Sequence, residues 1–349
     1  MSRINISPKS VIYVLLGLVL LWVIYNVGGE VGEPFTTNAS GNNQLISTKQ
    51  PYADLDLRVA NSAIYQGSPI KKLKDLGVDH QVNRMIISFA VPADSLTEYG
   101  LMTTPQTPTP AAGYPVIILL HGYIQPSVYS TKNAYLSEME FYSQHGFVVI
   151  KPDLRGQGLS IHAGKPEGAY YSMAYNTDVM SLIASVKRTP GLNPSNMSLW
   201  GHSMGAYLAL RAAVLSPDIK NVILLSAPAG YVQDMYMSFT PRSDFANPVA
   251  FSIRKKVLAQ HGTPLNNPNY WDYTSPINFL ANTRATIQIY VGAKDTVVPP
   301  KFSADLNQAL DQLQAPHYYY VYPNGKHGLL AERSQIYERS LQILQVNNK

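Results

Sequence analysis

A serine between two glycines stands where an apolar run gives way to a stretch rich in alanine and leucine. The pentapeptide is Gly201-His202-Ser203-Met204-Gly205, and the apolar run Met197–Trp200 precedes it. A serine hydroxyl becomes a good nucleophile when it projects from a sharp turn and a base takes its proton. Such a turn crowds the backbone two residues to either side of the serine, and glycine avoids the clash. This spacing predicts a strand, a tight turn and a helix, with Ser203 as the nucleophile at the turn.

This serine has two candidate partners later in the chain, a histidine and an aspartate. His327 lies in a turn-rich loop after the last apolar run, and Asp295 directly follows the run before it. The carboxyl ends of parallel strands meet at one edge of a sheet, so loops at these positions can bring their side chains together. A serine nucleophile needs a histidine that accepts its proton and a carboxylate that orients the histidine. We therefore predict that His327 is the general base and that Asp295 orients it.

The negative charge that develops on an attacked carbonyl group needs hydrogen-bond donors, usually two of them. We expect one from the backbone N–H of Met204, because a helix N-terminus carries unpaired N–H groups and a partial positive charge. We expect the other from the N–H of Tyr123, since Gly122 before it lets the backbone approach a substrate closely. The neighbouring histidines, His121 and His202, are predicted to pack behind the site rather than to act as bases.

Asp153 is a second acidic residue that follows an apolar run. It precedes Ser203 in the chain, and Arg155 offers it a charged partner two residues away. We therefore predict that Asp153 and Arg155 form a structural pair and that Asp295 is the acid of the site.

The elements that must position these residues alternate between short apolar runs and helical patterns. Continuous apolar runs separated by helices are typical of a parallel sheet that is covered on both faces. Two strand-like segments, Met85–Val91 and Glu98–Thr103, come before this alternation and read as an antiparallel pair. The runs expected as parallel strands are Val116–Leu120, Phe147–Ile150, Met197–Trp200, Val222–Leu225, Ile287–Val291 and Tyr318–Tyr322. The predicted architecture is an α/β fold with a mostly parallel, eight-stranded sheet.

The alternation stops once, over residues 228–284, and this stretch is rich in aromatic side chains. An insertion after the carboxyl end of a strand lies over the site in open α/β sheets. We therefore predict a small helical cap here, with Phe239 and Trp271 lining the substrate pocket. The alternative is a packed excursion of the chain that makes no contact with substrate.

The N-terminal part of the chain contains an uncharged, largely apolar segment, residues 11–29, which is just long enough to span a bilayer. Arg3 and Lys9 precede it, and Glu30 and Glu33 follow it, which predicts a cytoplasmic N-terminus and an extracytoplasmic catalytic domain. A cleaved signal peptide, which would give a secreted enzyme, is the alternative. The predicted layout is a cytoplasmic tail over 1–10, a transmembrane signal anchor over 11–29, a flexible linker over 28–60 and a catalytic domain over 61–349.

The composition limits the remaining possibilities. The 349 residues include no cysteine, which excludes disulfides, thiolate metal ligands and a cysteine nucleophile. The formal net charge is +5, but the basic residues are scattered. The densest groups, Lys71 to Lys74 and Arg254 to Lys256, belong to no nucleic-acid-binding motif and read as solvated faces. We predict neither a nucleic-acid partner nor a metal or organic cofactor, and the oligomeric state stays open.

As a set, these motifs resemble the catalytic domain of the prolyl-oligopeptidase type, peptidase family S9, and its dienelactone-hydrolase-like and esterase relatives. The resemblance covers roughly residues 80–345 and implies an α/β-hydrolase fold. It also implies a serine nucleophile, a histidine base and an aspartate acid, which match Ser203, His327 and Asp295. The motifs that carry it, in chain order, are His121-Gly122-Tyr123, Asp153-x-Arg155-Gly156-x-Gly158-x-Ser160, Gly201-His202-Ser203-Met204-Gly205, Ser275-Pro276, Gly292-x-x-Asp295-x-x-Val298-Pro299 and Gly325-x-His327-Gly328.

The sequence therefore predicts a serine hydrolase that cleaves an ester or amide bond through an acyl-enzyme. Its substrate is expected to be a small ester or a peptide, and an esterase and an S9-type peptidase are both compatible with the motifs. Two other functions remain open. One is a non-catalytic binding module built on a hydrolase scaffold, and the other is an acyltransferase that passes the acyl group to an acceptor other than water.

Overall fold

The structure, a computed structural model, describes residues 56–161, 173–234 and 248–347. The chain divides into two compact units, residues 1–42 and 43–349, and the described residues belong to the second unit. The predicted tail, the anchor and most of the linker lie outside the described residues. Within the described ranges, no helix has the length and apolar character needed to cross a membrane.

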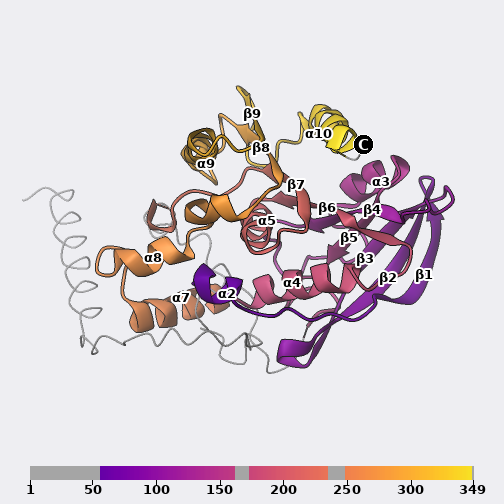
Figure 1. The fold of residues 1–349 in the computed structure, drawn as a ribbon, viewed down its shortest axis with the longest axis horizontal. Helices are drawn as coiled ribbons and strands as arrows, with labels where there is room; N and C mark the ends of the chain where they lie inside the picture. Colours follow the sequence, from indigo (N-terminus) through magenta and orange to yellow (C-terminus); the bar gives the residue numbers. More distant parts are fainter. Residues whose placement is uncertain (1–55, 162–172, 235–247, 348–349) are drawn as a thin grey trace, which may run out of the picture. The chain divides into compact units, whose positions relative to one another are not determined.

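A single nine-stranded sheet organises the described residues, with the strand order β1-β2-β3-β5-β4-β6-β7-β8-β9 (Figure 1). The first three strands and the β3–β5 pair run antiparallel, and the remaining pairs are parallel. The strands are β1 (Lys71–Asp79), β2 (Val82–Val91), β3 (Leu96–Pro105), β4 (Tyr114–Leu120), β5 (Val148–Pro152), β6 (Leu192–His202), β7 (Ile219–Leu225), β8 (Thr286–Gly292) and β9 (His317–Tyr322). This arrangement confirms the predicted fold class, with one strand more than expected.

The additional strand is β1, and its sequence explains why it was not expected. Nearly all of its side chains are exposed, so Lys71–Asp79 shows no alternation of apolar and polar residues. It pairs with β2 through a tight turn in which His80 and Gln81 have positive φ angles of 45° and 62°. Backbone pairing, rather than burial of an apolar face, therefore holds β1 on the sheet.

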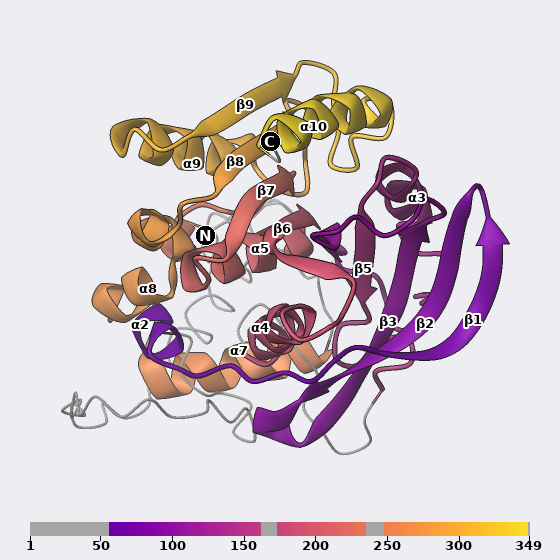
Figure 2. The same ribbon diagram turned by 45° about the vertical axis from the view of Figure 1, so that its right-hand side comes forward.

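Helices cover both faces of the sheet (Figure 2). Along β4, Val116, Ile118 and Leu120 belong to one apolar cluster, and the alternate residues Ile117 and Leu119 belong to another. Helices α4, α5 and α9 contribute to the first cluster, and α3 and α10 to the second. The helices are α2 (Leu57–Asn61), α3 (Leu136–Gln144), α4 (Ala174–Val186), α5 (Met204–Leu215), α7 (Pro248–His261), α8 (Pro268–Thr274), α9 (Pro300–Gln312) and α10 (Arg333–Asn347). This two-sided burial is what continuous apolar strands require.

The described part of the predicted cap is helical. It consists of α7, α8 and the 3-10 helix η3 (Pro276–Asn282), and α8 lies beside α2 in both ribbon views (Figures 1 and 2). Helix η3 packs against α5, the helix that follows Ser203. Phe239, one of the two predicted pocket residues, lies outside the described residues.

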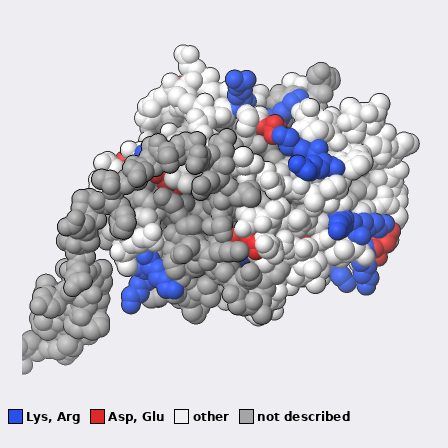
Figure 3. Space-filling model, turned by 60° about the horizontal axis from the view of Figure 1, so that its bottom comes forward, with Lys and Arg blue, Asp and Glu red and all other residues white. Residues whose placement is uncertain are grey.

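Among the side chains that Figure 3 colours by charge, the basic and acidic ones form small separate groups. The lysines of the two densest basic groups, Lys71, Lys72, Lys74, Lys255 and Lys256, are exposed. Exposed positions of this kind match the solvated faces predicted from the sequence.

Candidate active site

Ser203 occupies the turn between β6 and α5, and the backbone there is strained. Its φ and ψ angles are 54° and −121°, a region that residues with a side chain rarely adopt. A Cβ atom added at Gly205 would overlap the carbonyl oxygen of Leu120, and one at Gly201 would overlap the carbonyl oxygen of Gly205. The two glycines therefore permit the close contacts of the turn, which is the reason that the sequence spacing suggested.

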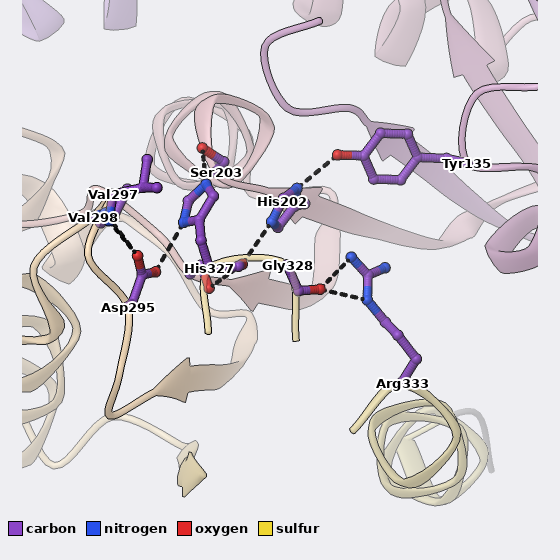
Figure 4. Close-up of polar contacts among 10 residues, drawn as sticks. Tyr135, His202, Ser203, Asp295, Val297, Val298, His327, Gly328 and Arg333 are labelled. Atoms are coloured by element: carbon purple, nitrogen blue, oxygen red, sulfur yellow. Dashed lines mark hydrogen bonds and ion pairs between the residues drawn. The ribbon is translucent and has the colours of Figure 1, made fainter. Parts of the chain in front are cut away.

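His327 and Asp295 meet Ser203 at the carboxyl edge of the sheet (Figure 4). The Nε2 atom of His327 lies 3.0 Å from the Ser203 hydroxyl oxygen, and its Nδ1 atom lies 2.8 Å from Asp295 Oδ2. The other oxygen of Asp295 accepts hydrogen bonds from the backbone N–H groups of Val297 and Val298, at 2.8 and 2.9 Å. The three residues predicted for the site are thus linked in one chain of hydrogen bonds.

The electrostatics of Asp295 suit a residue that orients a histidine. Burial alone would raise the pKa of its carboxyl group, but the hydrogen bond and charge of His327 oppose this effect. Together with the N–H groups of Val298 and Val297 they hold the pKa of Asp295 below its usual range. The carboxylate therefore stays ionised and accepts the Nδ1 proton of His327, which leaves Nε2 free to accept the proton of Ser203.

Three side chains form hydrogen bonds with the backbone of the His327 loop. The sequence predicted that one of them, His202, packs behind the site, but it did not assign Ser226 or Arg333 to the site. The carbonyl oxygen of His327 accepts hydrogen bonds from His202 Nε2 at 3.0 Å and from the Ser226 hydroxyl at 2.8 Å. Arg333 donates two hydrogen bonds to the carbonyl oxygen of Gly328, at 3.0 and 2.9 Å. Ser226 carried a weak signal, because it directly follows β7 at the catalytic edge. Arg333 carried no such signal, because it contacts the site through the backbone carbonyl group of Gly328.

The two predicted oxyanion donors lie on segments that pack directly on each other. Gly205, at the start of α5, contacts the end of β4 at Leu120, and Tyr123 follows three residues later. Within the described ranges, the backbone N–H groups of Met204 and Tyr123 make no hydrogen bond. The intervening N–H of Gly122, in contrast, donates to the Tyr135 hydroxyl at 3.0 Å. The role of Met204 and Tyr123 stays a prediction, and their N–H groups are available for it.

Comparison with known proteins identifies the family. Residues 133–345, more than half of the chain, match the sequence model of the prolyl oligopeptidase family. The chain belongs to this family. Dipeptidyl-aminopeptidase B of Aspergillus niger is 25% identical over 275 residues, which are 73% of this chain and 28% of that protein. This chain spans less than a third of the length of the first curated relatives that it matches.

Solved structures show the same fold. Acetyl xylan esterase from Paenibacillus sp. R4 matches with a TM-score of 0.60 at 17% identity, over 81% of this chain and 90% of that chain. Acylaminoacyl peptidase from Pyrococcus horikoshii matches with a TM-score of 0.55 at 16% identity, over 81% of this chain and 42% of that chain. Membership of the prolyl oligopeptidase family places the chain among the serine hydrolases.

In this prolyl oligopeptidase family member, the two other histidines near Ser203 are buried. His121 Nδ1 lies 2.7 Å from the carbonyl oxygen of Gly122, and its ring lies 4.7 Å from that of Tyr129. His202 bridges Tyr135 and the backbone of His327. Burial lowers the pKa of each histidine to about 3, so both are neutral and suit the packing role predicted for them.

The prediction that Asp153 and Arg155 pair with each other is wrong, because each of them binds other partners. Asp153 accepts hydrogen bonds from the Tyr129 hydroxyl at 2.7 Å and from the Leu159 N–H at 2.9 Å. Arg155 contacts Asp94 at 2.9 Å and also pairs with Asp178. Asp153 thus ties the loop after β4, which carries the predicted oxyanion donor, to the loop after β5.

The prediction that Trp271 lines the substrate pocket is wrong for this structure. Its side chain has no exposed surface, and it packs in an apolar cluster that includes Val298 and Phe302. Its indole N–H donates to the carbonyl oxygen of Gly262 at 3.2 Å. An aromatic residue in an insertion can pack in a core as readily as it can line a substrate pocket. The composition of residues 228–284 did not distinguish these two possibilities.

One group of side chains within the described ranges could in principle hold a metal ion. It consists of Asp79, His80 and Glu140, at the β1–β2 turn and on α3. Arg84 donates to Asp79 at 2.6 Å, and His80 lies 3.0 Å from Glu140. These contacts already pair the acidic groups with basic partners, and none of the three residues belongs to the chain of hydrogen bonds at Ser203.

Proposed function

We propose that the protein hydrolyses an ester or amide bond through an acyl-enzyme, with Ser203, His327 and Asp295 as its catalytic triad. The observation that supports this most directly is the continuous line of hydrogen bonds from Asp295 through His327 to Ser203, with distances of 2.8 and 3.0 Å. It ends on a serine in a strained strand-to-helix turn, the position that the nucleophile takes in α/β-hydrolases.

The reaction follows from this geometry. The Ser203 oxygen attacks the carbonyl carbon of the substrate while its proton passes to His327 Nε2. The N–H groups of Met204 and Tyr123 stabilise the negative charge on the former carbonyl oxygen. His327 then gives the proton to the leaving alcohol or amine as the bond to it breaks. Water attacks the acyl group, His327 takes a proton from it, and the acid leaves as Ser203 recovers its proton.

The substrate is proposed to be a small ester or a peptide. The prolyl oligopeptidase family supports a peptide, and the fold shared with an acetyl xylan esterase is also compatible with an ester. Both bonds present a carbonyl carbon to the same nucleophile and release a group that His327 can protonate. The choice between them therefore depends on the surroundings of the triad rather than on the triad itself.

The test combines labelling with substrate profiling. A fluorophosphonate probe should label the wild-type protein on Ser203, and Ser203→Ala should abolish the labelling. Panels of p-nitrophenyl esters and aminoacyl arylamides then show which bond is cleaved. No labelling and no turnover would favour a binding module, and an acyl product on an added alcohol or amine in place of the free acid would favour an acyltransferase.

We also propose that residues 11–29 anchor the enzyme in a membrane with an extracytoplasmic catalytic domain. The support is the uncharged segment with Arg3 and Lys9 before it. Protease added to intact cells should release the catalytic domain. Full protection of the catalytic domain from the protease would indicate the opposite topology. A soluble product with a new N-terminus near residue 30 would favour signal cleavage.

A further inference from the structure

The Tyr135 hydroxyl, whose contact with His202 is drawn in Figure 4, connects the two loops on which the proposed reaction depends. It accepts a hydrogen bond from the backbone N–H of Gly122 at 3.0 Å and lies 2.6 Å from His202 Nδ1. On the other side of the ring, His202 Nε2 lies 3.0 Å from the carbonyl oxygen of His327. Gly122 directly precedes the proposed oxyanion donor, and His327 is the proposed base.

The chemistry of these groups allows a single arrangement of protons. A carbonyl oxygen only accepts, so His202 Nε2 must carry a hydrogen and donate it to His327. The ring is neutral because it is buried, so its Nδ1 atom carries no hydrogen and accepts from Tyr135. The tyrosine oxygen in turn accepts from Gly122. Every donor along this path from one loop to the other meets an acceptor.

The backbone around Tyr135 is shaped to make this link. Tyr135 itself has φ and ψ angles of 57° and 27°, the left-handed region, directly before α3. Such a conformation is unfavourable for a bulky residue and persists only where the surrounding structure enforces it. A Cβ atom at Gly122 would lie 3.0 Å from both the Tyr135 hydroxyl and His202 Nδ1, so a larger residue there would press on the link.

We propose that Tyr135, acting through His202, is a positioning residue that sets the oxyanion loop at Gly122 and Tyr123 relative to the base loop at His327. Because the Gly122 N–H is engaged by Tyr135, the neighbouring N–H of Tyr123 is the one presented to the substrate. This inference rests on the proposed function and adds to it a physical coupling between the oxyanion donors and the base. A link of this kind acts on the transition state, in which both loops must be placed correctly at once.

The first test is Tyr135→Phe, with turnover normalised to the number of sites that a fluorophosphonate titrates. Complete removal of an oxyanion donor costs about 100-fold to 1,000-fold in kcat, so loss of its positioning should cost roughly tenfold. KM should change less than about twofold, because ground-state binding does not use the oxyanion donors. A variant that only folds less well would have fewer titratable sites but the same kcat per site.

The matched control is Tyr142→Phe. Tyr142 lies on α3, is buried, and its hydroxyl lies 2.7 Å from the Ser340 hydroxyl. Its substitution removes a comparable hydrogen bond without touching either loop. It should lower the melting temperature while kcat per titrated site stays at the wild-type value. An equal fall in kcat for both variants would overturn the proposed role of Tyr135.

A second variant tests whether the two side chains act as one path. His202→Gln can retain a donor near the former Nε2 position but lacks the acceptor that faces Tyr135. Combined with Tyr135→Phe, it should reduce kcat no further than the slower single variant does, within about twofold, because interactions within one network are not additive. Effects that multiply would overturn the path.

These experiments distinguish failure of the proposed hydrolase function from failure of the positioning role of Tyr135. A wild-type protein that neither labels nor turns over any ester or amide would overturn the proposed function, and the positioning role with it. An active wild type, together with a Tyr135→Phe variant of unchanged kcat per site, would overturn the positioning role alone.

Discussion

Two clusters of polar side chains in this protein hold their charges in different ways. The site cluster comprises Ser203, His327, Asp295 and His202, and the charge cluster comprises Asp94, Glu98, Arg155 and Asp178. In the site cluster, one carboxylate faces a histidine whose side chain keeps 21% exposure. In the charge cluster, one guanidinium lies near three carboxyl groups, and no side chain is more than 4% exposed. A group that transfers protons to a substrate needs access, and only the site cluster offers it.

The charge cluster instead joins parts of the fold. Arg155 follows β5, Asp94 lies in η1 (Pro92–Asp94) between β2 and β3, and Asp178 lies on α4. The ion pairs therefore connect the antiparallel end of the sheet to a helix that covers it. Buried ion pairs of this kind add little net stability, but removing one partner leaves charges that nothing compensates. The comparison predicts that substitutions in the site cluster reduce turnover, whereas those in the charge cluster reduce stability.

The largest effect is expected for Ser203→Ala. The variant lacks the nucleophile, so kcat should fall by roughly 10⁴-fold to 10⁶-fold, as in other serine hydrolases. Its melting temperature should stay close to that of the wild type, because alanine replaces only a hydroxyl at the same strained position. Steady-state kinetics and thermal unfolding measure the two quantities. Ser340→Ala removes another buried hydroxyl and should leave kcat unchanged. A residual rate within tenfold of the wild type would assign the nucleophile elsewhere.

The opposite result is expected for Arg155→Met. The substitution leaves buried carboxyl groups without their cation, and the free energy of unfolding should fall by about 3–5 kcal/mol. Turnover per titrated site should remain at the wild-type level. The control is Lys187→Met, which breaks a surface pair with Asp218 and should cost less than about 1 kcal/mol. A large loss of kcat per site in Arg155→Met would show that the two clusters are not separate.

The pH dependence of stability distinguishes the clusters further. Burial, together with the charge of Asp178, raises the pKa of Glu98 from its ordinary 4.5 to about 9. The folded protein thus binds this proton more tightly than the unfolded chain does. Its contribution to stability is complete below pH 4.5 and is lost as the pH rises toward 9.

Glu98→Gln keeps this position neutral at every pH and isolates its effect. The free energy of unfolding of the wild type, minus that of Glu98→Gln, should decrease between pH 5 and pH 9. Denaturant titrations at several pH values provide the measurement. A difference that is constant or increases over this range would mean that Glu98 is ionised in the folded protein.

The site was more predictable from the sequence than the region around it, and the reason is local. Ser203, Asp295 and His327 each directly follow or closely follow an apolar strand, and parallel strands present such positions at one edge. Gly201 is required by a contact with Gly205, four residues along the chain, so part of the reason for the spacing is visible in the sequence, whereas Gly205 is required by a contact with Leu120 on β4. The same logic predicted the parallel strands, since the apolar runs in β4 to β8 are buried on both faces. Strand β9, at the edge of the sheet, is only partly buried.

Other features depend on contacts that no local pattern records. Strand β1 has exposed side chains on both faces, so neither its presence nor its register could be read from apolar residues. Tyr135 and Arg333 act on backbone groups of Gly122 and Gly328, and a backbone carbonyl or N–H group has the same sequence signal everywhere. Trp271, in the predicted cap, is buried, but a sequence pattern does not distinguish burial in a core from burial by a substrate.

The smallest effect is expected for Trp271→Phe, and it tests where the site cluster ends. Trp271 packs in the same apolar cluster as Val298, whose N–H donates to Asp295, so it lies one contact behind the triad. If this contact only supports the fold, the substitution should cost roughly 1 kcal/mol of stability. It should then lower turnover of short and long acyl esters by the same small factor, because a fully buried side chain does not touch the acyl group.

A profile of kcat/KM against acyl length provides the measurement, and Val257→Ala, another buried member of the cluster, is the control. A change in length preference that appears in Trp271→Phe but not in Val257→Ala would show that the indole is exposed when substrate binds, and would extend the site to Trp271.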